Sequence, residues 1–158
     1  MDDILEEFCN DSNQIIAELE LILEKLEDSP EQYILLESYG QKIDRIMGAA
    51  KSLGYEKIGS LSESSKIISY KVAQTKNKEF IKIAVAILFD AVDAINEILQ
   101  NLIEKKEEII DTSRENAVFS RVKFIADKLT HIQRASVAID DQELLGMADS
   151  FAELKKKK

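Results

Sequence analysis

Apolar residues recur every three or four positions along almost the whole chain, which is the spacing of one face of an α-helix. The first such stripe, between Leu5 and Leu26, has acidic residues on its other face. The 158 residues include one proline and five glycines, so helix breakers are rare. A β-hairpin shows a turn dipeptide between two runs of alternating apolar and polar residues, and this sequence has no such pattern. The sequence therefore predicts an all-α protein.

Breaks in this spacing divide the chain into five long helices and a short one. We expect helices at about 3–26, 30–53, 56–74, 79–106 and 114–136, and a last helix that Asp140 and Asp141 cap and that ends near Leu154. The helix at 79–106 is apolar nearly all round near Val85 and Phe89, so it should be the most buried one. Short connections favour antiparallel neighbours, which predicts an up-down four-helix bundle with one or two additional helices.

Two local signals mark the ends of the second helix. Ser29 can cap it, Pro30 suits its first position and Gln32 would complete a capping box. Gly54 suits the left-handed position that ends a helix. We expect this helix to bury one apolar side at Leu35 or Leu36, Tyr39, Ile43, Ile46, Ala50 and Leu53, and the third helix to present an outer face rich in serine and lysine.

The chain should divide into a bundle at 1–107 and C-terminal helices at 112–154 that pack on the bundle or extend it. The four lysines at 155–158 are interpreted as a solvated, flexible tail. If the C-terminal helices packed elsewhere, an apolar seam would require a partner or a second copy of the chain, and it would consist of Val118, Val122, Ile125 and Leu129.

Charge and composition exclude several classes of function. A net charge of −9 argues against nucleic acid, whose phosphates bind to basic faces. The longest apolar run, 83–89, is too short to span a membrane, and the acidic start predicts no signal peptide. The single Cys9 excludes a disulfide framework and is interpreted as a small core residue. These features favour a cytoplasmic protein.

Residues 39–55 carry the most informative pattern, because Gly48 and Gly54 are six positions apart and Leu53 precedes the second glycine. This segment resembles the phosphoacceptor helix of histidine-phosphotransfer (Hpt) domains of the CheA N-terminal type, whose motif is H-x-x-K-G-x-x-x-x-x-G. The order and lengths of the helices over residues 1 to about 105 are similar too. The histidine position is Asp44 and the lysine position is Met47, so the chain resembles a degenerate member of that family.

The resemblance implies a surface at which a response regulator approaches. Asp44 lies opposite the apolar stripe and should be exposed, with glycines one turn before and one turn after it. A glycine inside a helix costs about 0.5–1 kcal/mol relative to alanine, so such a row indicates either a docking surface or a relic of ancestry. The predicted docking surface consists of Gly40, Gln41, Asp44, Met47, Gly48 and Lys51. With Met47 in place of lysine, Asp44 should have no cationic partner, and it is a poor mimic of phosphohistidine.

Other candidate residues offer little chemistry. His131 is the only histidine, and the segment 130–135 loosely resembles a histidine followed three residues later by a base, so it is the alternative phosphoacceptor. Asp90, Asp93 and Glu97 share a helix, but without a nearby histidine they are interpreted as a solvated face rather than a metal site. Phosphate loops, nucleophile elbows and paired cysteines are absent from the sequence. We therefore expect no enzyme activity, no metal and no cofactor.

Three hypotheses of function follow. The first is a non-catalytic adaptor in two-component or chemotaxis-like phosphorelay signalling, which binds a response-regulator receiver or a histidine kinase domain through the second helix. The second is an active phosphotransfer protein that uses His131. The third is a structural interaction protein, with a homodimer through its C-terminal helices. The pathway, the partner and the direction of regulation stay open.

Overall fold

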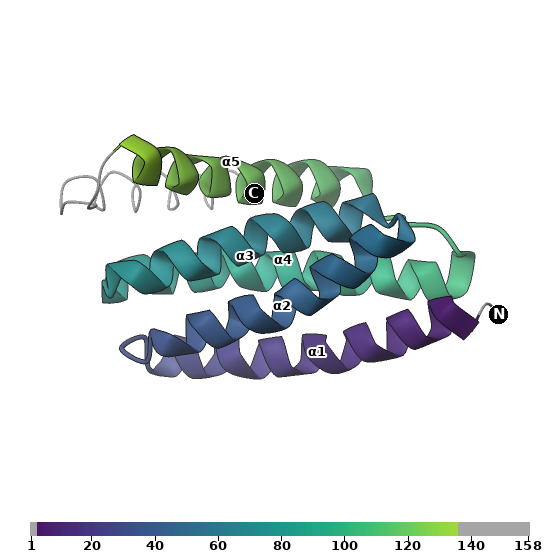
Figure 1. Ribbon diagram of the computed structural model, residues 1–158, viewed down its shortest axis with the longest axis horizontal. Coiled ribbons are helices and arrows are strands. Elements are labelled where there is room, and N and C mark those ends of the chain that lie inside the picture. Colours follow the sequence, from purple (N-terminus) through teal and green to yellow (C-terminus); the bar gives the residue numbers. More distant parts are fainter. Residues whose placement is uncertain (1–2, 136–158) are drawn as a thin grey trace.

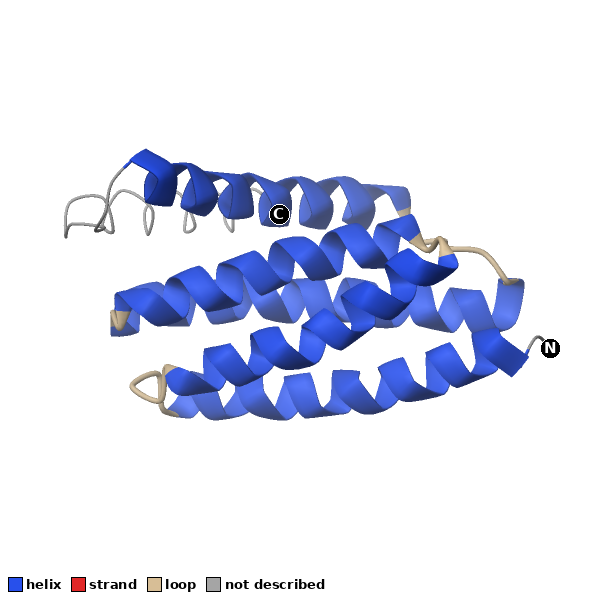
Figure 2. Ribbon diagram, in the orientation of Figure 1, coloured by secondary structure: helices blue, strands red, loops and turns tan. Residues whose placement is uncertain are grey.

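The protein is all-helical over the residues that its computed structural model describes, which are 3–135, with side chains described as far as residue 130. Figure 2 shows helices joined by loops and turns, without strands in this part of the chain. The helices are α1 (Asp3–Asp28), α2 (Ile34–Leu53), α3 (Glu56–Thr75), α4 (Lys78–Lys105) and α5 (Thr112–Ala135). The predicted all-α class is confirmed, whereas the expected last helix and the lysines at 155–158 lie outside the described residues.

The first four helices run up and down and form a bundle in which α1 packs against α2 and α4, and α3 packs against α2 and α4 (Figure 1). The fifth helix, α5, lies on the outside of the bundle and packs against α3 and α4. The turn before α3 and the start of α1 lie at one end of the bundle, and the loop between α1 and α2 lies at the other (Figure 1). This arrangement places α2 between α1 and α3, with one side left open.

Burial follows the apolar stripes that the sequence predicts. The helix α4 contributes the longest set of buried residues, from Phe80 to Leu102, and the prediction that it is the most buried helix is confirmed for the described residues. On α5 the seam of Val118, Val122, Ile125 and Leu129 is buried, because α3 and α4 cover it. The apolar seam is therefore used inside the molecule.

The start of α2 differs from the prediction. The expected capping box at Ser29 is wrong, because the backbone N–H of Ser29 donates to the carbonyl oxygen of Lys25 at 2.8 Å and so continues the end of α1. Gln32 then donates its backbone N–H to the Ser29 carbonyl at 3.0 Å in a turn, and α2 begins only at Ile34. Proline fits the second position of a tight turn as well as the first position of a helix, and here Pro30 occupies the second position of the turn from Ser29 to Gln32.

The end of α2 agrees with the prediction. Gly54 has φ of +83°, in the left-handed region that glycine adopts without steric cost. The backbone N–H of Tyr55 donates to the Ala50 carbonyl at 2.8 Å, and that of Gly54 donates to the Lys51 carbonyl at 3.3 Å. This pair of bonds is a Schellman motif, which closes the helix and turns the chain into α3 within two residues.

Ion pairs join α5 to the bundle. Arg121, 4% exposed, donates from Nη1 to Asp90 Oδ2 on α4 at 2.6 Å. Arg114 Nη1 donates to Glu97 Oε1 at 2.5 Å, and Lys57 Nζ on α3 lies 3.1 Å from Glu115 Oε1. The interpretation of this face as solvated agrees with Asp93, which is exposed, but is wrong for Asp90 and Glu97, because α5 covers this side of α4 and brings arginines to it.

Candidate functional site

The exposed side of α2 is the candidate site, and its position follows from the helix period. Leu36, Tyr39, Ile43, Ile46 and Ala50 are buried, as predicted. The opposite side presents Gln41, Asp44, Met47, Gly48 and Lys51, which we call the Asp44 face. Gln41, Gly48 and Lys51 are exposed, whereas Asp44 and Met47 are half-buried.

Asp44 has a cationic partner, contrary to the prediction. Lys66 on α3 donates from Nζ to Asp44 Oδ1 at 2.7 Å, and this hydrogen bond raises the pKa of Lys66 above its ordinary value. The positive charge that Met47 does not supply thus comes from the neighbouring helix. At neutral pH the carboxylate and the ammonium group form a neutral pair at the surface.

Gly48 lies in the open. A Cβ atom built at Gly48 would have nothing within 4 Å, so packing inside the protein does not require glycine here. One turn from Asp44, the backbone of α2 is therefore accessible to an approaching molecule. The geometry suits both a docking surface and a relic of ancestry.

Lys51 is held at the edge of the same face. Its Nζ forms an ion pair with Glu63 on α3, and its aliphatic part lies over Gly59, where an added Cβ would come within 3.0 Å of Lys51 Cγ. The Asp44 face is therefore tied to α3 at two places, by Lys66 and by Glu63.

Gly40 does not belong to the Asp44 face, and its predicted exposure is wrong. Gly40 is buried against α3, where an added Cβ would lie 2.8 Å from Ser69 Oγ and from the ring of Tyr70. Ser69 contributes to this close contact. Ser62 and Ser69 are buried, although the sequence predicted an outer face of α3 rich in serine. The glycine thus serves the packing of α2 on α3.

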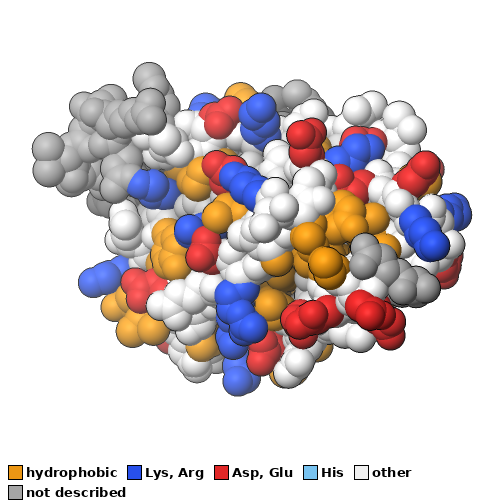
Figure 3. All heavy atoms as spheres, turned by 45° about the vertical axis from the view of Figure 1, so that its right-hand side comes forward, with side chains coloured by type: hydrophobic (Ala, Val, Ile, Leu, Met, Phe, Trp, Pro, Cys, Tyr) orange, Lys and Arg blue, Asp and Glu red, His pale blue; other side chains and the backbone are white. Residues whose placement is uncertain are grey.

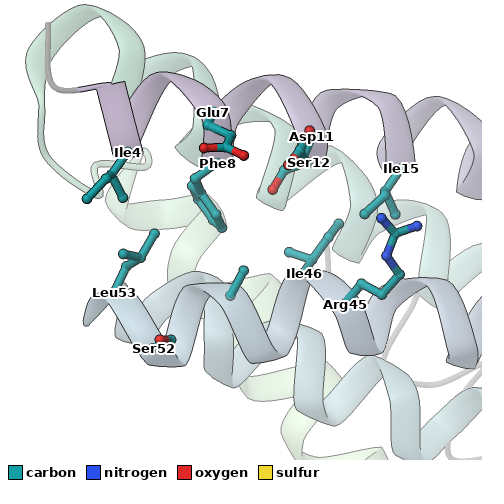
Figure 4. A pocket seen from close by; sticks show the side chains of 11 residues that line it. Ile4, Glu7, Phe8, Asp11, Ser12, Ile15, Arg45, Ile46, Ser52 and Leu53 are labelled. Carbon is teal, nitrogen blue, oxygen red and sulfur yellow. The ribbon is translucent and has the colours of Figure 1, made fainter.

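A groove between α1 and α2 lies next to the Asp44 face, on the side of α2 that faces α1. It has a volume of about 370 Å³ and is lined by Ile4, Glu7, Phe8, Asp11, Ser12 and Ile15 of α1 and by Arg45, Ile46, Ala49, Ser52 and Leu53 of α2; we call it the α1–α2 groove. Apolar side chains from both helices point toward one another across it (Figure 4). Leu53, predicted to be buried, is 39% exposed here. Figure 3, which brings this end of the molecule forward, shows hydrophobic side chains at the surface with acidic side chains beside them.

No sequence pattern predicted the α1–α2 groove. The available signal was the pair of small residues Ala49 and Ser52, which lie on the side of α2 that faces α1 and cannot fill the space between the helices. Large apolar residues at both positions would have closed it.

The remaining candidate residues lie apart from both surfaces or outside the described side chains. His131 lies within α5, which packs against α3 and α4 rather than α2, and its side chain is outside the described part. Cys9 is buried in the core, and burial raises the pKa of its thiol, which keeps it protonated at neutral pH.

The part of the chain that the structure describes contains neither a metal-binding cluster nor a helix able to cross a membrane. No group of three histidine, cysteine, aspartate or glutamate side chains there can hold a metal ion. Likewise, none of the helices in 3–135 has the length and apolar character that crossing a bilayer demands.

Comparison of the chain with protein-family models, curated proteins and solved structures found no match. The likeness to Hpt domains therefore depends on the motif in α2 and on the order of the helices.

Proposed function

We propose that this protein is a non-catalytic signalling adaptor of the Hpt type, which binds a response-regulator receiver or a histidine kinase domain through the Asp44 face. In this proposal it takes part in two-component phosphorelay signalling without accepting a phosphoryl group. The adaptor would compete for, or localise, a partner that normally meets a phosphotransfer helix.

One observation carries this proposal. At the position that corresponds to the phosphoacceptor histidine, α2 presents an aspartate neutralised by Lys66, beside an exposed glycine that packing does not require. Because Gly48 has no side chain and the charge of Asp44 is paired, another helix or loop can come close to the backbone of α2 here. The imidazole that a phosphohistidine needs is missing from this helix, since the single histidine of the chain is His131 on α5.

The other two hypotheses receive less support. The His131 side chain lies outside the described part of the chain, so phosphotransfer through it stays a prediction. The apolar seam on which the dimer hypothesis depended is buried against α3 and α4. A homodimer would have to use other residues.

The test is a calorimetric titration of the protein against the receiver and kinase domains encoded in its own genome. We expect at least one of them to bind the wild-type chain, and we expect Gly48→Lys to abolish that binding. The long side chain would stand between α2 and the approaching domain. Because Gly48 is exposed, lysine should hold or raise the stability of the fold by up to about 1 kcal/mol.

The matched control is Ala17→Lys, which adds the same side chain and charge at an exposed position on α1, away from α2. It should bind as the wild type does. Failure of every receiver and kinase domain to bind the wild-type chain, or normal binding by Gly48→Lys, would contradict the proposal. Acid-labile phosphate from a kinase and labelled ATP that disappears in His131→Ala would favour the second hypothesis instead.

A further inference from the structure

The α1–α2 groove is an uncovered apolar surface between two helices that are otherwise well packed. Ile4 is 59% exposed and Leu53 39% exposed, although each faces apolar residues of the other helix. Toward the interior, Phe8, Ile15 and Ile46 are buried and form its floor. A further apolar side chain placed between Ile4 and Leu53 would lose its contact with water on both sides.

The shape of the groove suits one helix. The lining residues of α1 follow the helical spacing from Ile4 through Phe8 and Ser12 to Ile15, and those of α2 run from Ile46 through Ala49 to Leu53. At 1.5 Å per residue, the groove thus runs for about three turns, or about 16 Å, along α1 and for about two turns, or about 12 Å, along α2. An amphipathic helix laid into such a groove inserts side chains at positions i, i+3 or i+4, and i+7.

Charge indicates which helix fits. Glu7 and Asp11 lie along the α1 side of the groove, and Arg45 lies at the end marked by Ile15 (Figure 4). From Asp3 to Glu24 the sequence of α1 contains no lysine or arginine. Of the described residues that line the groove, only Arg45 is basic. An occupant with lysine or arginine beside its apolar stripe would complement the acidic side.

We propose that the α1–α2 groove binds one amphipathic helix of a partner protein, with basic residues over Glu7 and Asp11 and an acidic residue near Arg45. Apolar side chains of this helix would lie against Ile4, Phe8 and Leu53. This binding site goes beyond the proposed function, because its residues are separate from the Asp44 face.

The first test uses a synthetic helical peptide of about five turns, with leucine at i, i+4 and i+7, lysines flanking this stripe and one glutamate at the end. Binding to the full-length chain is measured by fluorescence anisotropy. Ala49→Gln places a longer, uncharged side chain in the groove without changing net charge, and we expect it to weaken binding about tenfold or more. The control Ala17→Gln makes the same change on the exposed side of α1 and should leave affinity unchanged.

The second test reverses charge. In Glu7→Lys/Asp11→Lys we expect affinity for the lysine peptide to fall about tenfold or more, and affinity for a peptide with glutamates in place of the lysines to rise. The control is Glu20→Lys/Glu24→Lys, which has the same spacing, helix and change of net charge but lies outside the groove. In a buffer of physiological ionic strength, this control should change affinity less than about threefold, because salt screens charges that lie far from the peptide.

Three results would overturn the proposal. The first is an equal loss of peptide affinity in the groove variants and in their controls. The second is no binding of the lysine peptide at millimolar concentration. The third is self-association of the wild-type chain that Ala49→Gln abolishes. The last result would assign the groove to a second copy of the chain. Peptide binding should persist in Gly48→Lys, since Gly48 does not line the groove. The proposal for the Asp44 face and the proposal for the α1–α2 groove are therefore tested independently.

Discussion

At the scale of single residues, the two glycines in the body of α2 have opposite surroundings. Gly40 faces α3, with Ser69 and Tyr70 where its side chain would be, whereas Gly48 faces open space. The same substitution at these two positions therefore separates packing from helix propensity.

We expect Gly40→Ala to lower the free energy of unfolding by about 1–3 kcal/mol, because the added methyl group forces Ser69 and Tyr70 to move. Gly48→Ala should raise it by about 0.5–1 kcal/mol, because alanine favours the helix and meets nothing. Urea denaturation of both variants measures the difference. Equal effects, or a stable Gly40→Ala, would show that α2 and α3 can separate slightly without cost.

The period of one helix was sufficient to place Asp44 and Gly48 on the outside of α2. It could not find Lys66 or Tyr70, which decide the surroundings of Asp44 and Gly40, because both lie on α3. The rotation of α3 against α2 depends on how the two surfaces fit, and no spacing within α2 contains that information.

At the scale of helices, the start of α5 depends on one exposed carboxylate. Asp111 Oδ1 accepts hydrogen bonds from the hydroxyl of Ser113 at 2.5 Å, and from the backbone N–H groups of Ser113 at 3.1 Å and Arg114 at 3.4 Å. These bonds, the Ser113 hydroxyl first, lower the pKa of Asp111 from its ordinary value of 3.8. The Asp111 side chain therefore caps α5, which begins at Thr112.

A lowered pKa fixes the direction of the pH dependence. The contribution of Asp111 is fully present above pH 3.8 and is lost as pH falls below that value through the pKa of the folded state. We therefore expect the backbone N–H groups of Ser113 and Arg114 to lose protection from hydrogen exchange in this acidic range. Asp111→Asn, which keeps an acceptor oxygen but does not titrate, should remove this pH dependence. An unchanged profile in Asp111→Asn would assign the effect to other carboxyl groups.

The limits of the helices were predictable where the chain itself determines them. Gly54 ends α2 because only its own backbone conformation is required, and Asn77 begins α4 by accepting the Phe80 N–H at 2.9 Å. The start of α2 was not predictable in this way, because Ser29 and Pro30 fit a helix start and a turn equally well. The connection between α1 and α2 decides between them.

At the scale of the whole molecule, α5 protects an apolar side of the bundle. We expect the intact chain to sediment as a monomer and a chain ending at Lys106 to self-associate, because removing α5 uncovers the parts of α3 and α4 that bury Val122, Ile125 and Leu129. Sedimentation velocity at several concentrations measures this. A dimer of the intact chain would show that another surface joins two copies, and a monomeric short chain would show that α5 is dispensable for solubility.

The start of α3 is completed by a side chain that comes much later in the chain. Glu108, between α4 and α5, accepts hydrogen bonds from the backbone N–H groups of Lys57 at 3.3 Å and Ile58 at 2.9 Å, which are 51 and 50 positions earlier. A helix cannot satisfy these first donors by itself. Because Glu108 follows α4 in the chain, these two donors can meet this partner only after α4 has been synthesised. The bend between α2 and α3 therefore depends on local hydrogen bonds at Gly54, whereas the first backbone donors of α3 depend on a residue of the connection between α4 and α5.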